Sequence, residues 1–256
     1  MNLESGIYYN IPFTEYQGWD AINNSTLVKI LKESPAHAKE YKDNPPEQSK
    51  AFFLGSAAHK LILEPLKFDD EYCVMPKIDR RTKAGKEEYE EFVQNAGDKI
   101  VIDDETFNAV LKMSEAVGKT SIAREFLSCG EAEASIIWDC GIMAKARIDY
   151  LQDNLIVDLK TTANARPEVF AQSALKYSYD QQLAFYADSY EAITGERPSA
   201  VIIAVEKTPP FGVSVHQVTE STLLQGRELY KKAVEIYKEC LVFDNWPCYP
   251  QEINLI

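Results

Sequence analysis

Residues 145–162 read Lys-Ala-Arg-Ile-Asp-Tyr-Leu-Gln-Asp-Asn-Leu-Ile-Val-Asp-Leu-Lys-Thr-Thr, and this stretch decides the fold. Polar and apolar side chains alternate in its first part, which predicts a strand, and the Gln-Asp-Asn sequence then predicts a turn. The apolar and β-branched residues after the turn predict a second strand. Because side chains alternate between the faces of a strand, Lys145, Arg147 and Asp149 share one face of the first strand.

The polar residues of this hairpin predict a phosphodiester-cleaving site. Asp158 and Lys160 share one face of the second strand, and Asp149 lies within reach on the first. Asp149 and Asp158, with the backbone carbonyl of Leu159, supply the oxygen ligands that magnesium prefers. Lys160 would polarise the attacking water and neutralise the phosphate. The alternative is a solvated hairpin face, which is common for an isolated Asp-x-Lys sequence.

Composition bounds the class of protein. The chain has 256 residues, of which 45% are hydrophobic, so it can bury a substantial core. Its net charge of −13 argues against a generally basic nucleic-acid-binding surface, although a local basic groove inside an acidic shell would suffice for DNA. The first residues lack the pattern of a signal peptide, and no run of about 18 apolar residues occurs, so we expect neither secretion nor a membrane span.

The five cysteines form no Cys-x-x-Cys pair. We therefore expect reduced thiols, as is typical of the cytoplasm. Four closely grouped thiolates are also missing from the sequence, so we expect no iron–sulfur cluster.

One apolar helix carries a candidate ligand. The pattern of residues 51–64 predicts this helix, and Gly55 and His59 lie on one face of it because they are four residues apart. A glycine costs about 1 kcal/mol in a helix interior, so we expect the backbone or DNA to approach closely there. We favour a position of His59 near a metal or a phosphate; a satisfied core histidine is the alternative.

The N-terminal half is otherwise predicted to be mostly helical. Residues 1–24 show little periodicity and predict an extended arm or an irregular lead-in. Residues 66–130 predict a charged helical region, which contains the densest basic cluster of the chain. We expect either a solvated loop or contact with DNA phosphates for this cluster. Its members are Lys77, Arg80, Arg81, Lys83 and Lys86.

The remaining sheet and two further functional candidates flank the hairpin. A strand begins at residue 131, and its Glu133 could reach the metal or could be an exposed edge charge. Gln182 and Tyr186 lie one turn apart on a predicted helix, where they could contact the DNA backbone, support the lysine and its water, or belong to the core. The other expected elements are helices at 25–33, 36–41, 86–94, 105–117, 167–175, 181–190 and 221–241, and strands at 142–150, 199–205 and 212–218.

These residues together resemble the PD-(D/E)xK nuclease superfamily, with Val157 at the position of the proline. More narrowly, the chain is similar to the nuclease domain of the RecE / exonuclease VIII family, in the order of its motifs and over nearly its whole length. The matching pieces are Ser34-Pro-Ala-His37, Gly55-Ser-Ala-Ala-His59 with Leu63-Glu-Pro65, Glu133-Ala-Ser with Trp138, Lys145-Ala-Arg-Ile-Asp149, Asp158-Leu-Lys-Thr-Thr162, Gln182-Leu-Ala-Phe-Tyr186 and Trp246-Pro247.

The resemblance implies an α/β (α+β) fold with a restriction-endonuclease-like core: a central mixed sheet flanked by helices, with an N-terminal helical region. It implies that His59, Asp149, Asp158 and Lys160 form the site, with Gln182 and Tyr186 against it. We expect one nuclease domain over residues 1–256, comprising a mostly helical part (1–130), the catalytic sheet with the Gln-x-x-x-Tyr helix (131–220), and a C-terminal helix and tail (221–256).

The implied activity is a magnesium-dependent 5′-to-3′ exonuclease on linear double-stranded DNA, with manganese as a substitute. Its 3′ single strands would serve a RecT-like annealing recombinase, in the cytoplasm of a bacterial or phage-infected cell. A homo-oligomeric ring threaded by DNA is also implied, with Lys145, Arg147 and the Arg80–Lys86 cluster facing the channel. The alternatives are an endonuclease of the same fold, a Cas4-like nuclease, which the cysteine spacing opposes, and a catalytically silent scaffold that binds DNA ends.

Overall fold

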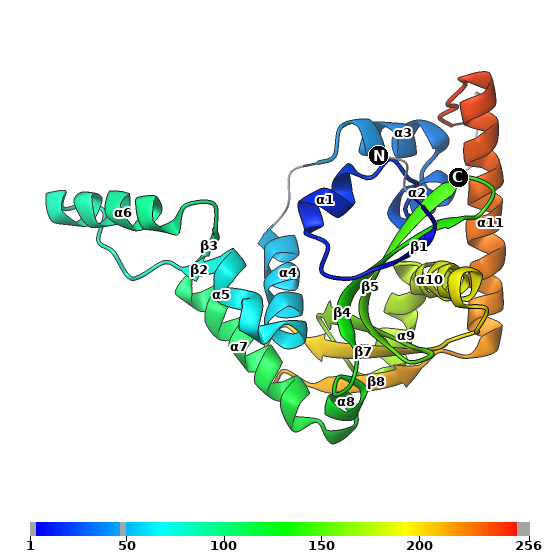
Figure 1. Cartoon of the computed structure of the whole chain (residues 1–256). Helices are drawn as coiled ribbons and strands as arrows, with labels where there is room; N and C mark the ends of the chain where they lie inside the picture. The colour runs from blue at the N-terminus through cyan, green and yellow to red at the C-terminus, as the bar shows by residue number, and fades with distance from the viewer. Residues whose placement is uncertain (1–3, 47–49, 250–256) are drawn as a thin grey trace, which may run out of the picture.

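The computed structural model describes residues 4–46 and 50–249. Within these residues the main sheet has six strands, in the order β1-β4-β5-β6-β7-β8 (Figure 1). β6 and β7 are parallel and the other neighbours are antiparallel, so the predicted mixed sheet is confirmed. The strands are β1 (Gly6–Tyr8), β4 (Glu131–Asp139), β5 (Met143–Gln152), β6 (Leu155–Thr162), β7 (Ser199–Glu206) and β8 (Val213–Gln217).

Helices cover both faces of this sheet, as predicted (Figure 1). α10 (Tyr179–Thr194) packs on one face together with α2 (Asn24–Lys32) and α11 (Glu220–Phe243), whereas α4 (Lys50–Leu63) and α7 (Asp104–Lys119) pack on the other. The remaining helices are α1 (Phe13–Gly18), α3 (Pro35–Asp43), η1 (Pro65–Lys67), α5 (Phe68–Glu71), α6 (Lys83–Ala96), α8 (Ser121–Phe126) and α9 (Pro167–Lys176).

Strict alternation along the central strands divides the core between the two faces. Ile156 and Ile202 are buried against the α10 side, whereas Val157 and Ile203 are buried against the α4 side. Adjacent residues of a strand point to opposite faces, so a strand covered on both sides reads as a continuous apolar run. The Leu-Ile-Val sequence of β6 is such a run, because β6 lies inside the sheet and is covered on both faces.

β5 and β6 form the predicted hairpin, with Asn154 in the left-handed region (φ 57°) that asparagine tolerates at turns. The ladder between the two strands ends after three residue pairs, of which Tyr150↔Val157 is the last. Beyond that pair β5 continues along β4, and β6 continues along β7. The two strands therefore separate and leave a fork between them.

Short strands in the N-terminal half were not predicted. Residues 1–24 were expected to form an extended arm or an irregular lead-in; in the described part, β1 is extended and pairs with β4, and α1 follows it. Residues 66–130 are mostly helical, as expected, but β2 (Tyr72–Val74) and β3 (Ile100–Ile102) form a second, parallel pair within them. Strands of three residues are too short to show a period, and their partners are distant in sequence.

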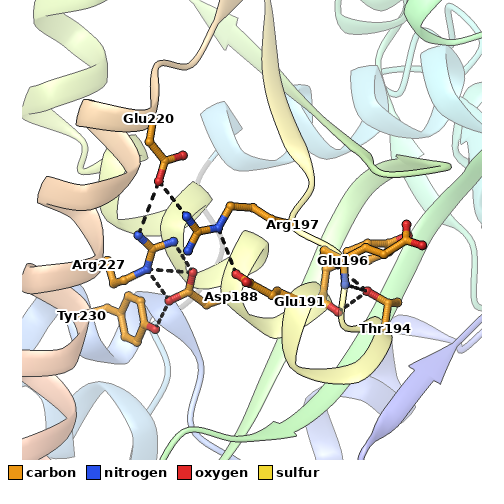
Figure 2. Close-up of polar contacts among 9 residues, drawn as sticks. Asp188, Glu191, Thr194, Glu196, Arg197, Glu220, Arg227 and Tyr230 are labelled. Atoms are coloured by element: carbon orange, nitrogen blue, oxygen red, sulfur yellow. Dashed lines mark hydrogen bonds and ion pairs between the residues drawn. The ribbon is translucent and has the colours of Figure 1, made fainter.

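A cluster of ion pairs joins α10 to α11 (Figure 2). Arg227 of α11 donates to both carboxylate oxygens of Asp188 on α10, and Tyr230 donates to the same carboxylate. Arg197 links Glu191 of α10 to Glu220 at the start of α11. These contacts fix α10 to its outer neighbour while its inner face borders the fork. In the part of the chain described here, no helix is long and apolar enough to cross a membrane.

Candidate active site

Several of the residues predicted to form the site come together at the fork. Asp149 and Asp158 are the first residues beyond the last β5–β6 pair. The backbone N–H of Leu159 donates to Oδ2 of Asp149 at 2.8 Å, so this carboxylate takes the place of a ladder acceptor. The N–H and C=O of one strand residue point to the same side, and the Leu159 carbonyl therefore also faces the fork. Its orientation fits the predicted backbone ligand.

Asp158 and Lys160 form a buried ion pair on β6. The Asp158 residue has no exposed surface, and Lys160 Nζ lies 2.7 Å from its carboxylate oxygens. Lys160 has hydrogen-bond geometry toward Oδ1, whereas Oδ2 has no hydrogen-bond donor among the described residues. Burial raises the pKa of Asp158 to about 6; Lys160 opposes this rise and Asp149 adds to it.

The balance between burial and neighbouring charges also sets the protonation state of Lys160. Burial alone would lower its pKa, but Asp158 and Asp149 outweigh that effect and the pKa is raised. The ammonium group also lies 5.0 Å from the centre of the Tyr179 ring. Lys160 is therefore protonated and can donate hydrogen bonds in the cluster formed by Asp149 and Asp158.

α4 delivers His59 to the same place. His59 Nδ1 lies 3.6 Å from Asp149 Oδ2. Burial lowers the pKa of His59, Lys160 lowers it further, and Glu133, Asp158 and hydrogen bonding with the Leu159 backbone counter the fall. The expected close approach at Gly55 is modest, because an added Cβ would meet Thr161 Oγ1 at 3.6 Å, an ordinary contact. A neutral imidazole beside a carboxylate is a suitable metal ligand.

Glu133 has an unusual backbone. It lies level with Asp149, at a gap in the β4–β5 ladder between the pairs Ala132↔Tyr150 and Ala134↔Ile148, and its φ is 57°. Residues two apart normally share a face, yet Ala134 packs in the core under α10 and Ala132 against the core under α4. The left-handed residue coincides with this change of face, and β5 changes face at the same level, between Ile148 and Tyr150. Such strain costs of the order of 1–3 kcal/mol and is concentrated at functional sites.

Arg147 holds the Glu133 carboxylate in this position. Its guanidinium forms an ion pair with Glu133 and also donates to the Ile11 carbonyl at 3.0 Å and to Ser135 Oγ at 3.3 Å. The pKa of Glu133 is raised by burial and by Asp149, and Arg147 opposes this shift. The side chain of Glu133 is thus a positioned carboxylate, not an exposed edge charge.

The donor set fits a divalent cation. Ligand atoms of His59, Glu133 and Asp149 all lie within 4.8 Å of one another. Burial raises the pKa of Asp149, with Lys160 and the Leu159 N–H in opposition. Three carboxylates face the two cations Lys160 and Arg147, which leaves an excess negative charge, and a bound cation would relieve it. Asp158 is not one of the three residues whose ligand atoms lie within 4.8 Å of one another, and its carboxylate is paired with Lys160.

The start of α10 closes the site from the other side. Gln182 Nε2 donates to the Tyr186 hydroxyl at 2.9 Å, so the two predicted residues form a pair. Burial raises the pKa of Tyr186 well above its usual value, and Tyr16, Asp149 and Asp158 add to the rise. Tyr179, whose ring lies against the ammonium group of Lys160, was not among the site residues predicted from the sequence. Its spacing of three residues from Gln182 was the available signal, since it places both on one helix face.

Two residues predicted to contact DNA have other partners. Lys145 is 6% exposed, and its Nζ donates to the carbonyls of Tyr16, Gln17 and Trp19 at 2.9, 2.9 and 2.7 Å. It caps the C-terminal end of α1. Arg147 is engaged with Glu133. Neither side chain is therefore free to make the contact with a DNA phosphate that was expected from the sequence. Residues 6–22 cover this face of β5 and supply partners to both side chains.

The predicted basic cluster is also absent from the fork. Arg80 and Arg81 lie in the loop before α6, and Lys83 and Lys86 lie in its first turns. In Figure 1 this helix stands apart from the sheet. These four residues therefore lie apart from the carboxylates at the fork.

A family model and one solved structure agree with this fold. Residues 24–256 match the family described as a PDDEXK-like domain of unknown function (DUF3799). No curated protein matches the chain significantly. A presumed exonuclease from Eubacterium rectale has a similar crystal structure, with a TM-score of 0.70 at 14% identity, covering 94% of this chain and 90% of that one. A phage-related exonuclease from Haemophilus somnus gives a TM-score of 0.41 at 14% identity, covering 88% and 96%.

Proposed function

The chain belongs to the family of PDDEXK-like domains, and from the geometry of its site we propose that it is a divalent-metal-dependent deoxyribonuclease. The observation that carries this proposal is the fork itself. Asp149, Asp158 and Lys160 converge there although they come from two separating strands, and His59 and Glu133 join them from α4 and β4.

The residues at the fork divide into ligands and a proton-bearing group. His59, Glu133 and Asp149 would hold the metal, with the Leu159 carbonyl and Asp158 as further oxygen ligands. When bound, a divalent ion polarises a phosphate oxygen and lowers the pKa of a water molecule. We propose magnesium, with manganese as a substitute, because carboxylate and carbonyl oxygens dominate this ligand set.

Lys160 would act on the substrate directly. Its ammonium group is protonated and can donate to the attacking water and to a phosphate oxygen, where negative charge develops. The Tyr179 ring packs against the Lys160 ammonium group, and the hydrogen-bonded pair of Gln182 and Tyr186 on α10 borders the site. Arg147 holds Glu133 and has no contact with the substrate in this scheme.

We further propose that the substrate is linear double-stranded DNA, degraded from its 5′ ends. Two observations support an exonuclease: the ordered motifs shared with the RecE / exonuclease VIII family, and the fold shared with a protein named as an exonuclease. The remaining 3′ strands would serve a RecT-like annealing protein. A ring of identical subunits belongs to the same proposal, and light scattering that finds only a monomer would count against it.

The test is digestion of linear duplex DNA, labelled at either its 5′ or its 3′ end, with magnesium. Lys160→Ala and a closed circular duplex are the controls. Early release of 5′-labelled mononucleotide from the linear duplex, absent in the variant and on the circle, would establish the proposal. Cutting of circles would indicate an endonuclease. The absence of any magnesium- or manganese-dependent cutting would refute the nuclease and favour a scaffold that binds DNA ends.

A further inference from the structure

Residues 72–102 form an arm that projects from the body. β2 and β3 make its base, in the parallel register Tyr72↔Ile100 to Val74↔Ile102, and α6 is its outer part. In Figure 1, α6 stands away from the sheet and its covering helices, with its N-terminal end farthest out. The base is anchored, because Tyr72 and Ile102 are buried and the Tyr72 ring stacks on Phe68. The arm is therefore anchored at its base, and its outer part projects away from the body (Figure 1).

Positive charge is concentrated in the loop before α6 and in the first turns of that helix. Residues 77–86 contain five basic residues and one acidic residue, a net charge of +4, whereas the whole chain carries −13. The side chains of Lys77, Arg81 and Lys83 are 88%, 90% and 93% exposed. Their ion pairs with acidic neighbours are solvent-exposed, and such pairs are weak, so the cations stay available to a partner. Lys77 pairs with Asp104 at the start of α7 and so lies nearer the base of the arm. We call Arg80, Arg81, Lys83 and Lys86 the basic tip.

The backbone of the basic tip is well defined. Thr82 caps α6 by accepting a hydrogen bond from Gly85 N at 3.0 Å, and Asp79 Oδ1 accepts one from Arg81 N at 3.1 Å. A Cβ at Gly85 would lie 2.1 Å from the Asp79 carbonyl oxygen, so only glycine fits this turn. The guanidinium of Arg80 stacks on the Tyr89 ring at 3.9 Å. The cations are thus presented from a folded turn, which reduces the entropy lost when a partner binds.

We propose that the basic tip contacts the phosphate backbone of duplex DNA at a distance from the cutting site. This inference rests on the proposed function, which supplies a polyanionic substrate. The rest of the chain is strongly acidic and repels DNA, while Lys145 and Arg147 are engaged with protein groups. A separate positive surface is therefore needed to hold the duplex, and the basic tip provides it.

The experiment measures DNA binding in a Lys160→Ala background, so that no cutting interferes. Two duplexes are compared: a long one of about 40 base pairs, roughly 135 Å at 3.4 Å per pair, and a short one of about 8 base pairs, roughly 27 Å. The arm variant carries Arg80→Gln, Lys83→Gln and Lys86→Gln. The matched control carries Lys112→Gln, Lys119→Gln and Arg124→Gln, which are exposed on α7 and α8. A Lys83→Gln, Lys86→Gln double variant keeps the Arg80–Tyr89 stack.

The Lys160→Ala protein, which is the parent of the variants, should bind the long duplex more tightly than the short one. Its affinity for the long duplex should also depend more steeply on salt concentration. The arm variant should remove this difference: the slope of log K against log salt should fall by about 2–3, because each phosphate contact contributes about 0.9. Equal slopes for the arm variant and the control on the long duplex would overturn the inference, as would an equal loss on both duplexes. If the wild type cuts no DNA but the arm effect is present, the nuclease proposal fails and the arm contact stands.

Discussion

Glu133 and Asp149 lie at the same level of β4 and β5, at a gap in the ladder where neither is paired with the other strand, and Glu133 adopts a left-handed backbone with φ of 57°. Left-handed geometry is unfavourable for a residue with a Cβ, and a strand ordinarily excludes it. Here it coincides with the point at which β4 changes the face it presents to the core. The strain is maintained by the ion pair between Glu133 and Arg147 and by the regular pairs on either side.

This strain predicts an inverted order of stability between two variants. Glu133→Gly and Glu133→Ala both lose the carboxylate, but only glycine adopts the positive φ freely. Glu133→Gly should therefore be more stable than Glu133→Ala by about 1 kcal/mol, although alanine is normally the better residue in a strand. Urea unfolding in the presence of a chelator measures the difference. An alanine variant of equal or greater stability would contradict the left-handed assignment.

Metal binding should stabilise the protein through the carboxylates. Magnesium or manganese should raise the melting temperature of the wild type, because the ion binds the folded state and relieves repulsion there. Asp149→Asn can still accept the hydrogen bond of Leu159 N–H but lacks the charge, so its shift should be much smaller. Asp153→Asn, in the exposed hairpin turn, is the control and should shift as the wild type does. Equal shifts in all three proteins would place the metal elsewhere.

Asp158 predicts a dependence of stability on pH in the metal-free protein. Its pKa is raised from 3.8 to about 6 by burial, so the folded state binds the proton more tightly than the unfolded state. The resulting stabilisation is complete below the unfolded pKa and is lost as pH rises through about 6. It amounts to the order of 2–3 kcal/mol. Asp158→Asn does not titrate, so the stability of wild type minus that of the variant should fall between about pH 4 and pH 7.

Denaturant unfolding with a chelator at several pH values measures that difference. A difference that stays constant across the range would show that Asp158 ionises normally. A difference that rises with pH would mean that Lys160 dominates and lowers the pKa of the carboxylate instead.

The sequence was sufficient for the parts of the fold that are periodic and local. The hairpin, its turn and the pairing of Asp158 with Lys160 on one face follow from alternation with period two. Gln182 and Tyr186, predicted to lie one turn apart on a helix, do so, and they form a hydrogen bond with each other. In each case residues close in sequence determine the geometry.

The parts that depend on distant residues could not be predicted. Lys145 lies on the same predicted strand face as Asp149, yet its partners are carbonyls at the C-terminal end of α1 and just after it, more than 120 residues away. The three-residue strands β2 and β3 show no period, and the parallel register of β6 and β7 depends on a crossover through α9 and α10. The left-handed conformation of Glu133 is a tertiary effect, because glutamate itself disfavours it.

The three carbonyl contacts of Lys145 give a prediction that separates a structural role from DNA binding. Lys145→Met keeps the apolar stem but leaves the carbonyls of Tyr16, Gln17 and Trp19 without their donor. The free energy of unfolding should fall by about 2–4 kcal/mol, since hydrogen bonds to charged groups are worth about 1.5–3 kcal/mol each and are not additive. Lys231→Met on the exposed face of α11 should change it by less than about 0.5 kcal/mol.

DNA binding by Lys145→Met, measured in the Lys160→Ala background, completes this test. The slope of log K against log salt should match that of the parent, because a buried ammonium that caps α1 releases no counterions from DNA. If the slope instead falls by about 0.9 and the stability is unchanged, Lys145 contacts a phosphate. In that case residues 6–22 would have to move away from β5 when DNA binds, and the contacts of Arg147 with Ile11 would break with them.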